Sequence, residues 1–299
     1  MSVCVLGSIN LDIVCRVDAL PARGETVAGL SVHRFPGGKG LNQAAASARW
    51  GTSTALIGAV GDDDAADPLL DELAAAGVQT SGVARLAGVA TGHGYIFVSG
   101  AGENMIVISG GANRDLTTAH VRAQPAGDHT VFLSQLETPL AATAALFTSE
   151  AALRGVRILN AAPALDEGRA LFPLADFIVV NEVELARYAG EEGEAATQAR
   201  RLISRPGQTV VVTLGAAGAA AVDASDTFVA PGLAAQVVDT TGAGDCFCGV
   251  LAATLSQGAD LRQALAWANA AAALSTQTAG AAPSMPTRAA VEAFVAAGR

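Results

Sequence analysis

Runs of continuous apolar residues, many of them β-branched, alternate along this chain with segments whose apolar positions follow a helical period. The apolar runs predict strands at 3–6, 54–60, 131–136, 156–159, 177–180, 209–214 and 218–222. The periodic segments predict helices at 42–50, 68–76, 139–152, 182–189, 195–204, 244–255, 261–276 and 288–297. Because the strands are apolar throughout, both faces of their sheet should be covered. The pattern therefore predicts an α/β fold with a doubly wound, mostly parallel sheet flanked by helices.

One helix has chemical signals at both of its ends. Asp67 is a good N-cap residue, and Pro68 fits the first position of a helix. Gly77 suits the left-handed conformation that closes a helix. We therefore expect Asp67 to cap a helix that begins at Pro68 and ends before Gly77.

Two stretches, 11–35 and 89–108, lack a helical period and are rich in short β-type runs. They predict extra antiparallel strands inserted into the α/β core. Such an insertion suits a lid over a cleft at the strand ends. Because the sequence has no linker, repeat or low-complexity tail, we expect one domain over residues 1–299, with a β-lid from about 11–35 and 89–108.

The overall composition limits the kinds of partner. Of 299 residues, 51% are hydrophobic, and the formal net charge is −10. A sizeable core is therefore available without a partner. The acidic balance argues against nucleic acid or an anionic membrane, because both repel an acidic surface. The first residues lack the basic start of a signal peptide, and no segment has the roughly 18 consecutive apolar residues of a membrane span. We expect a cytoplasmic protein.

Four cysteines in a chain of this length do not predict a disulfide scaffold. Cys246 and Cys248 raise the alternative of a metal site. Their spacing is not that of a zinc ribbon, and no His pair follows at ligand spacing. Residues two apart on a helix also point to different faces. We expect small buried thiols instead.

The sequence DTTGAGD at 239–245 opens a helix made of small residues. Gly242, Ala243 and Gly244 allow their backbone amides to point into one concavity at the helix start, where a phosphoryl group would be stabilised. Asp245 in the first turn is poorly explained as a phosphate ligand, because like charges repel. It is better explained as the acceptor of a proton from an attacking hydroxyl. The alternative is that this is a helix cap without further function.

A second glycine turn, PGGKG at 36–40, also leads into a helix. It is not a Walker A loop, which needs a different spacing. Lys39 is the only lysine of the chain. Between Gly38 and Gly40 this lysine is not needed to stabilise the local structure, so we expect it to face a ligand.

Polar residues follow several predicted strands at the edge where ligands bind in parallel sheets. Asn10 and Asp12 lie two apart, so on an extended segment they face the same side and suit the hydroxyls of a polyol. An Asx turn that ends the strand is the alternative. Glu137 is a second candidate acceptor for a hydroxyl.

Two further strand ends suit a nucleotide. Asn181 and Glu184 could hold phosphates and the hydration shell of Mg²⁺, although a helix N-cap with an acidic first turn explains them equally. The loop from Thr213 through Gly215 to Gly218 would let a nucleotide lie close to the backbone.

Together these strings resemble a known family. GGKG-x-N at 37–42 and DT-x-GAGD at 239–245 resemble the two signatures of the PfkB, or ribokinase-like, carbohydrate kinases, and the match runs almost end to end. Further strings resemble the ribose kinases of that family: GSIN-x-D at 7–12, GETV at 24–27, GEN at 102–104, GGAN at 110–113, N-x-APA at 160–164 and NE-x-E at 181–184.

The resemblance implies MgATP-dependent phosphorylation of D-ribose at O5, with Asp245 as the general base. It also implies a monovalent cation, usually K⁺, and a homodimer formed through the lid. The residues implied to bind the sugar are Asn10, Asp12, Gly38, Lys39, Asn42, Glu137 and Asp245. Those implied to serve the nucleotide are Asn181, Glu184, Thr213, Gly215, Gly218, Gly244 and Asn269. The cation loop implied by the resemblance comprises Asp239, Thr241, Ser275, Thr278, Gly280 and Ser284.

Two alternatives stay open at this point. The acceptor could be another sugar or a nucleoside, since Tyr95, Phe97 and Met105 in the lid offer apolar surface for a base. The chain could also be a non-catalytic sugar sensor, although a sensor has no need of the base Asp245.

Overall fold

A nine-stranded sheet forms the centre of the molecule. The structure is a computed structural model that describes residues 1–124, 129–190 and 193–298. Its strand order is β13-β12-β11-β10-β9-β8-β1-β4-β5. The strands from β5 to β11 pair in parallel, and β12 and β13 are added antiparallel at one edge. The strands are β1 (Ser2–Leu6), β4 (Ser53–Gly61), β5 (Val78–Leu86), β8 (Val131–Ser134), β9 (Val156–Asn160), β10 (Phe177–Asn181), β11 (Thr209–Thr213), β12 (Gly218–Val222) and β13 (Thr227–Pro231).

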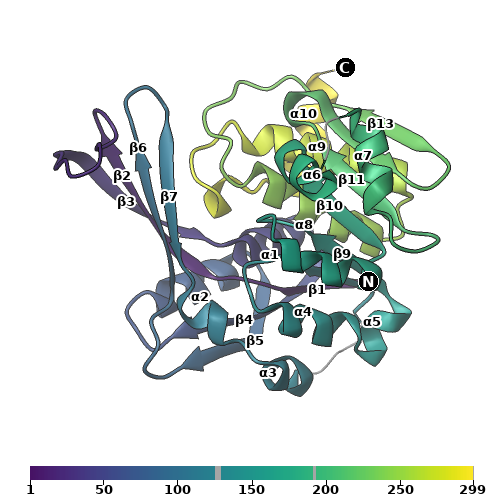
Figure 1. Cartoon of the computed structure of the whole chain (residues 1–299), viewed down its shortest axis with the longest axis horizontal. Coiled ribbons are helices and arrows are strands. Elements are labelled where there is room, and N and C mark those ends of the chain that lie inside the picture. Colours follow the sequence, from purple (N-terminus) through teal and green to yellow (C-terminus); the bar gives the residue numbers. More distant parts are fainter. Residues whose placement is uncertain (125–128, 191–192, 299) are drawn as a thin grey trace.

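Helices cover both faces of this sheet, as the continuous apolar strands predicted (Figure 1). In β1, Val3 and Val5 belong to the core on one face, while Cys4 and Leu6 belong to the core on the other. The first core is packed by α1 (Lys39–Arg49), α2 (Ala66–Ala75), α8 (Ala243–Ser256), α9 (Leu261–Ser275) and α10 (Arg288–Ala297). The second is packed by α3 (Thr118–Ala123), α4 (Leu140–Phe147), α5 (Glu150–Arg154), α6 (Glu182–Ala189) and α7 (Ala195–Leu202). The predicted doubly wound α/β fold is confirmed.

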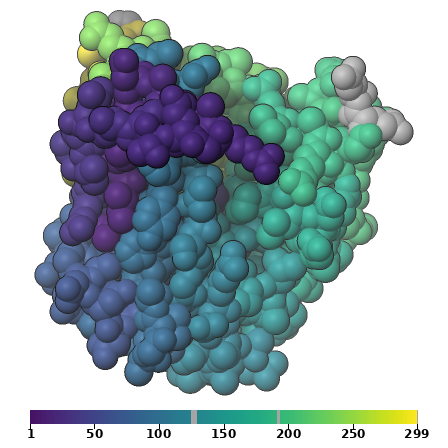
Figure 2. All heavy atoms as spheres, turned by 60° about the vertical axis from the view of Figure 1, so that its left-hand side comes forward, coloured from purple at the N-terminus to yellow at the C-terminus, as the bar shows by residue number. Residues whose placement is uncertain are grey.

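A second, four-stranded sheet projects from the main body (Figure 1), and we call it the lid sheet. Its order is β3-β2-β6-β7, from β3 (Gly29–Gly37), β2 (Asn10–Val17), β6 (Gly92–Val98) and β7 (Asn104–Ser109). In Figure 2, which is turned to bring this side of the molecule forward, purple atoms from the N-terminal part of the chain lie in front of the body. The expectation of purely antiparallel strands was wrong for the central pair, because β2 and β6 run parallel. Each outer strand follows its neighbour in the chain and pairs antiparallel with it.

Several local predictions need correction. Asp67 lies inside the first turn of α2, whose N-cap is Ala65, while Gly77 has the expected left-handed conformation. The single helix expected at 139–152 is divided into α4 and α5, because Ser149 takes an extended conformation and caps a new helix through the amide of Ala152. Strands β5 and β13 and helix α3 were not predicted. Among the described residues, no helix has the length and apolar character required to cross a membrane.

The carboxyl ends of the parallel strands bring polar residues to one edge of the main sheet. Ser8 follows β1, Gln135 follows β8, and Asn160, Asn181 and Thr213 are the last residues of β9, β10 and β11. The same edge receives the N-termini of α1 and α8, since Asn42 of α1 contacts Asp245 of α8. Ligands bind at this edge of open α/β sheets.

Candidate active site

Asp245 lies in the first turn of α8, which begins after Gly242 in a left-handed conformation (φ +78°). A side chain at Gly242 would be strained in this conformation and would meet Ala281 at 2.9 Å. The amide of Ala243 donates to the carbonyl of Thr240 at 3.2 Å. The amides of Gly244 and Asp245 belong to the first helical turn, which leaves them free of intrahelical partners. These two amides, rather than that of Ala243, are therefore the open donors for an anion.

The Asp245 carboxylate is buried and held by two amide side chains of α1. The Nδ2 atom of Asn42 donates to Oδ2 at 2.9 Å, and the Nε2 atom of Gln43 donates to Oδ1 at 2.9 Å. Each carboxylate oxygen has a further lone pair, so a hydroxyl can still donate to Asp245. The Oδ1 atom of Asn42 is buried and has no hydrogen-bond partner among the described residues. A buried acceptor of this kind fits a site that receives a ligand hydroxyl.

Lys39 is the first residue of α1 and lines a cavity with Asp245. Burial alone would lower the pKa of its ammonium group. The negative charges of Asp245, Glu137 and Glu184 outweigh this effect, and the pKa of Lys39 is raised. The residue therefore stays a cation among carboxylates, where it can also attract a phosphoryl group.

Asn10 and Asp12 face the same side of β2, as predicted, and glycines leave them their space. A Cβ atom on Gly94 would lie 2.4 Å from Oδ1 of Asp12, and one on Gly37 would lie 2.0 Å from its Oδ2. Asn113 donates to the Oδ1 atom of Asn10 at 2.8 Å. This leaves the Nδ2 atom of Asn10 as its donor for a ligand. The two residues begin a strand, so the alternative of an Asx turn at a strand end was wrong.

The pKa of Asp12 is raised to about 7 by burial, and then by the charges of Glu137 and Asp245. The folded chain thus keeps a proton between about pH 4 and pH 7 that the unfolded chain has lost, so this group lowers stability as the pH rises through that range. We expect Asp12→Asn to raise the thermal unfolding midpoint at pH 8, by a margin that shrinks at pH 5. Thermal scans at both pH values test this. A variant less stable than wild type at pH 8 would contradict it.

Glu137 lies three residues beyond β8, against the start of α1. Its Oε2 atom accepts from the hydroxyl of Ser8 at 2.5 Å and from the amide of Lys39 at 3.2 Å. Gly38, at the N-cap of α1 with φ +91°, packs against the same segment, since its Cβ would lie 2.8 Å from the Ser8 carbonyl oxygen. All the residues predicted to bind a sugar are therefore gathered around Lys39 and Asp245.

Two cavities meet at the start of α8. The smaller, of about 200 Å³, is lined by Lys39, Asp245 and Glu184 among others. The larger, of about 620 Å³, is mostly apolar and is lined by Asn269 and Phe247 among others. Thr213 and Gly244 line both. The larger cavity suits a nucleoside, and the smaller one suits phosphates between that nucleoside and the hydroxyl site.

The residues predicted for a nucleotide divide between these cavities. Those in the larger one are Thr213, Gly215, Gly218, Gly244 and Asn269. Asn181 and Glu184 line the smaller one. The capping alternative is confirmed for this pair: the amide of Glu184 donates to Asn181 Oδ1 at 2.8 Å, and the amide of Asn181 donates to Glu184 Oε2 at 2.9 Å. Burial raises the pKa of Glu184.

The segments predicted to hold a monovalent cation lie side by side. The Oδ1 atom of Asp239 accepts from the amide of Thr241 at 2.9 Å, and Oδ2 accepts from the amide of Gly280 at 2.9 Å. The carbonyl of Thr276 accepts from the amide of Asp239 at 3.0 Å. Thr278 is joined to Ser275, and Ser284 to Ala281, by backbone hydrogen bonds. Asp239 thus links two loops, and cation ligands would come largely from their carbonyl and hydroxyl oxygens.

Several residues of the site received no role from the sequence. Gln43, Gln135, Asn160 and Asn113 are all buried polar residues. The signal for Gln43 was available, because a polar residue in an alanine-rich helix next to Asn42 needs a partner when it is buried. The thiols of Cys246 and Cys248 are buried and free, as expected.

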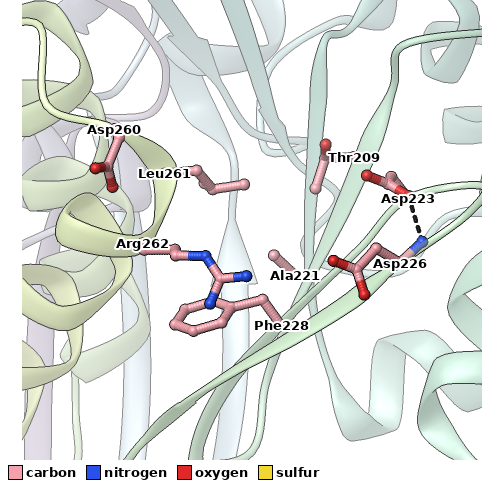
Figure 3. A pocket seen from close by; sticks show the side chains of 8 residues that line it. All are labelled: Thr209, Ala221, Asp223, Asp226, Phe228, Asp260, Leu261 and Arg262. Atoms are coloured by element: carbon pink, nitrogen blue, oxygen red, sulfur yellow. Dashed lines mark hydrogen bonds between the residues drawn. The ribbon is translucent and has the colours of Figure 1, made fainter.

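A separate cavity of about 400 Å³ lies away from this site (Figure 3). It is lined by Thr209 at the start of β11, whereas Thr213 at the end of β11 lines both cavities of the site. In it the guanidinium of Arg262 lies over the ring of Phe228 at 4.1 Å. None of the predicted site residues line it.

Comparisons with known proteins identify the family of this chain. The model of the pfkB family carbohydrate kinases matches residues 1–288. The ribokinase of Haemophilus influenzae is 36% identical over 291 residues, which are 95% of each chain. The structure of ribokinase from Thermotoga maritima matches with a TM-score of 0.90 and 32% identity, and covers 99% of both chains. The structure of Arabidopsis thaliana ribokinase complexed with ribose and ATP matches with a TM-score of 0.85 and 30% identity, over 98% of both chains.

A buried carboxylate beside free helix amides, with a lysine and a nucleoside-sized cavity, defines an enzyme that transfers a phosphoryl group to a hydroxyl. The chain belongs to the pfkB family of carbohydrate kinases.

Proposed function

We propose that this enzyme transfers the γ-phosphoryl group of ATP to O5 of D-ribose, giving ribose 5-phosphate. The observation that carries the proposal is the position of Asp245. Its carboxylate lies in the first turn of α8 and shares a cavity with Lys39 and Asn160. The similar ribokinase solved with ribose and ATP supports both substrates.

Each group of the site has a part in this reaction. The sugar lies against Asn10 and Asp12, and its O5 hydroxyl gives its proton to Asp245 as the oxygen attacks phosphorus. The amides at the start of α8 and the ammonium of Lys39 stabilise the charge on the transferred group. The lid sheet covers the sugar and excludes water, which suppresses hydrolysis of ATP. On this proposal residues 1–299 form one domain, with the lid sheet inserted into it.

Magnesium is the proposed partner of the ATP phosphates. Glu184 and Asn181 offer oxygen atoms beside the smaller cavity, and a hydrated Mg²⁺ prefers oxygen ligands. Bound there, the ion would neutralise phosphate charge. Because burial raises the pKa of Glu184, a nearby cation would favour its ionised form.

A monovalent cation, K⁺ by preference, is proposed to bind at the loops that Asp239 joins. These loops pack against the start of α8, since Ala281 limits the space at Gly242. A cation bound there would stiffen the segment that carries the anion-binding amides. The residues proposed for it remain Asp239, Thr241, Ser275, Thr278, Gly280 and Ser284.

The lid sheet also supports a proposed homodimer. Its strand β7 is exposed along its whole length, and Met105, Ile106, Val107 and Ile108 are each 45–55% exposed. An apolar edge of this kind fits a second copy of the sheet. We also propose the cytoplasm as the site of action, because all four cysteines are free.

Steady-state kinetics with a panel of acceptors tests the proposed function. ADP release would be followed with ATP and D-ribose, 2-deoxyribose, other pentoses, a ketose or a nucleoside, in K⁺ and in a bulky organic cation. We expect the highest kcat/KM for D-ribose and an increase with K⁺. A higher kcat/KM for a nucleoside would show that the acceptor is a nucleoside and not D-ribose. Ligand binding without any turnover would favour a sugar sensor.

A further inference from the structure

The side chain of Gln43 lies at the centre of a buried chain of amides. It is fully buried, one helical turn after Lys39 in α1. Its Nε2 atom donates to Oδ1 of Asp245 at 2.9 Å and to Oδ1 of Asn160 at 3.0 Å. Its Oε1 atom accepts from Nε2 of Gln135 at 2.7 Å. Both amide hydrogens and the carbonyl oxygen are thus engaged, which fixes the orientation of this amide.

The partners of Gln43 are anchored to the main sheet. Asn160 is the last residue of β9, and its Nδ2 atom donates to the carbonyl of Val179 in β10 at 3.3 Å. Gln135 directly follows β8, and Gly7 after β1 leaves room for it: a Cβ on Gly7 would lie 2.1 Å from its Oε1 atom. The amide of Gln43 is therefore held by residues at the carboxyl ends of the parallel strands β8 and β9.

We propose that Gln43 is a positioning residue that fixes the Asp245 carboxylate for proton transfer. This inference rests on the proposed function. A neutral amide can hold Oδ1 without taking the proton of the sugar hydroxyl, because it has no acidic or basic group of its own. Asn42 holds Oδ2 in the same way. With both oxygens fixed, the remaining lone pairs of the carboxylate point in set directions, and one of them receives the proton as the sugar oxygen attacks phosphorus.

Two substitutions separate this role from simple packing. Gln43→Met keeps the size and removes the donor, and we expect kcat to fall about 10- to 100-fold, the scale of a lost hydrogen bond to a charged group. Gln43→Glu keeps the shape and places a second carboxylate against Asp245, so its kcat should fall further. Calorimetry should give ribose and ATP dissociation constants within about threefold of wild type for Gln43→Met, because neither ligand contacts Gln43 in the proposed arrangement.

Ser47→Ala is the matched control. Ser47 is buried one turn further along α1, and its hydroxyl bonds to Thr54 at 2.9 Å, away from Asp245. It should keep wild-type kcat. Should Gln43→Met fail to fold, Gln135→Leu removes the donor to Gln43 while leaving the contact to Asp245, and kcat should fall about three- to tenfold.

Two results would overturn the inference: a folded Gln43→Met enzyme with kcat within about threefold of wild type, or a loss confined to ribose affinity. Failure of the proposed function would look different, since the wild-type enzyme would then prefer another acceptor. The kcat of the variants would in that case be measured with the acceptor that the wild-type enzyme uses.

Discussion

Asp245→Asn is expected to lower turnover at least about 100-fold while ribose and ATP still bind. The substitution keeps the size of the side chain and removes the group that takes the hydroxyl proton, and loss of a general base costs about this much. Pre-steady-state and steady-state ADP release give kcat, and calorimetry with ribose gives the affinity. The new amide has a single acceptor oxygen, so it can keep only one of the two hydrogen bonds that Asn42 and Gln43 donate to the carboxylate.

A second Asp→Asn change at a helix start serves as the control. Asp260 caps α9 through the amide of Gln263, and asparagine caps helices equally well. Asp260→Asn should therefore leave kcat unchanged. If Asp245→Asn also retained near-normal turnover, Asp245 would not be the base.

Lys39→Met is expected to lower kcat/KM for ribose about 100- to 1,000-fold, the cost of losing one fixed group that stabilises transition-state charge. Without the ammonium group, the phosphoryl group would enter a cavity that keeps the charges of Asp245 and Glu184. Because its pKa is raised, Lys39 should be charged throughout the neutral range, so the loss should be similar at pH 6.5 and pH 8.5.

Arg262→Met is the matched control for this change, because Arg262 is a cation in the remote cavity beside Phe228. It should have wild-type kinetics. A Lys39→Met enzyme within about tenfold of wild type at both pH values would contradict the assignment of Lys39 to the transferred group.

The sequence could predict those parts of the site that are marked by short patterns of neighbouring residues. The turns before α1 and α8 are marked by glycines. Gly38 and Gly242 both have a positive φ, which only glycine adopts at little cost. The polar residues at strand ends meet because the strands are parallel, which their apolar character indicated.

The remaining contacts depend on residues that are distant in the sequence. Asn42 and Asp245 are 203 positions apart, and no local pattern indicates that they share a hydrogen bond. The parallel pairing of β2 with β6 likewise sets Gly92 and Gly94 opposite Asn10 and Asp12. Short strands with mixed patterns allow several pairings, so packing of the whole chain decides among them.

The raised pKa of Asp12 is another property that depends on residues distant in the sequence. Its cause is burial together with Glu137 and Asp245, and these three carboxylates lie on separate elements. Bringing three carboxylates close enough to raise the pKa of Asp12 is unfavourable for folding. Such a cost in stability is expected at positions where the type of residue is selected for ligand binding rather than for stability.

The position of the transferred phosphoryl group gives the most direct test of the proposed reaction. The enzyme would be incubated with ATP, Mg²⁺, K⁺ and ¹³C-labelled D-ribose, and the product examined by ³¹P and ¹³C NMR. We expect one equivalent of ribose 5-phosphate for each ADP, with phosphorus coupled to C5. Phosphate on another carbon, or ADP and inorganic phosphate with unchanged ribose, would contradict phosphorylation of ribose at O5.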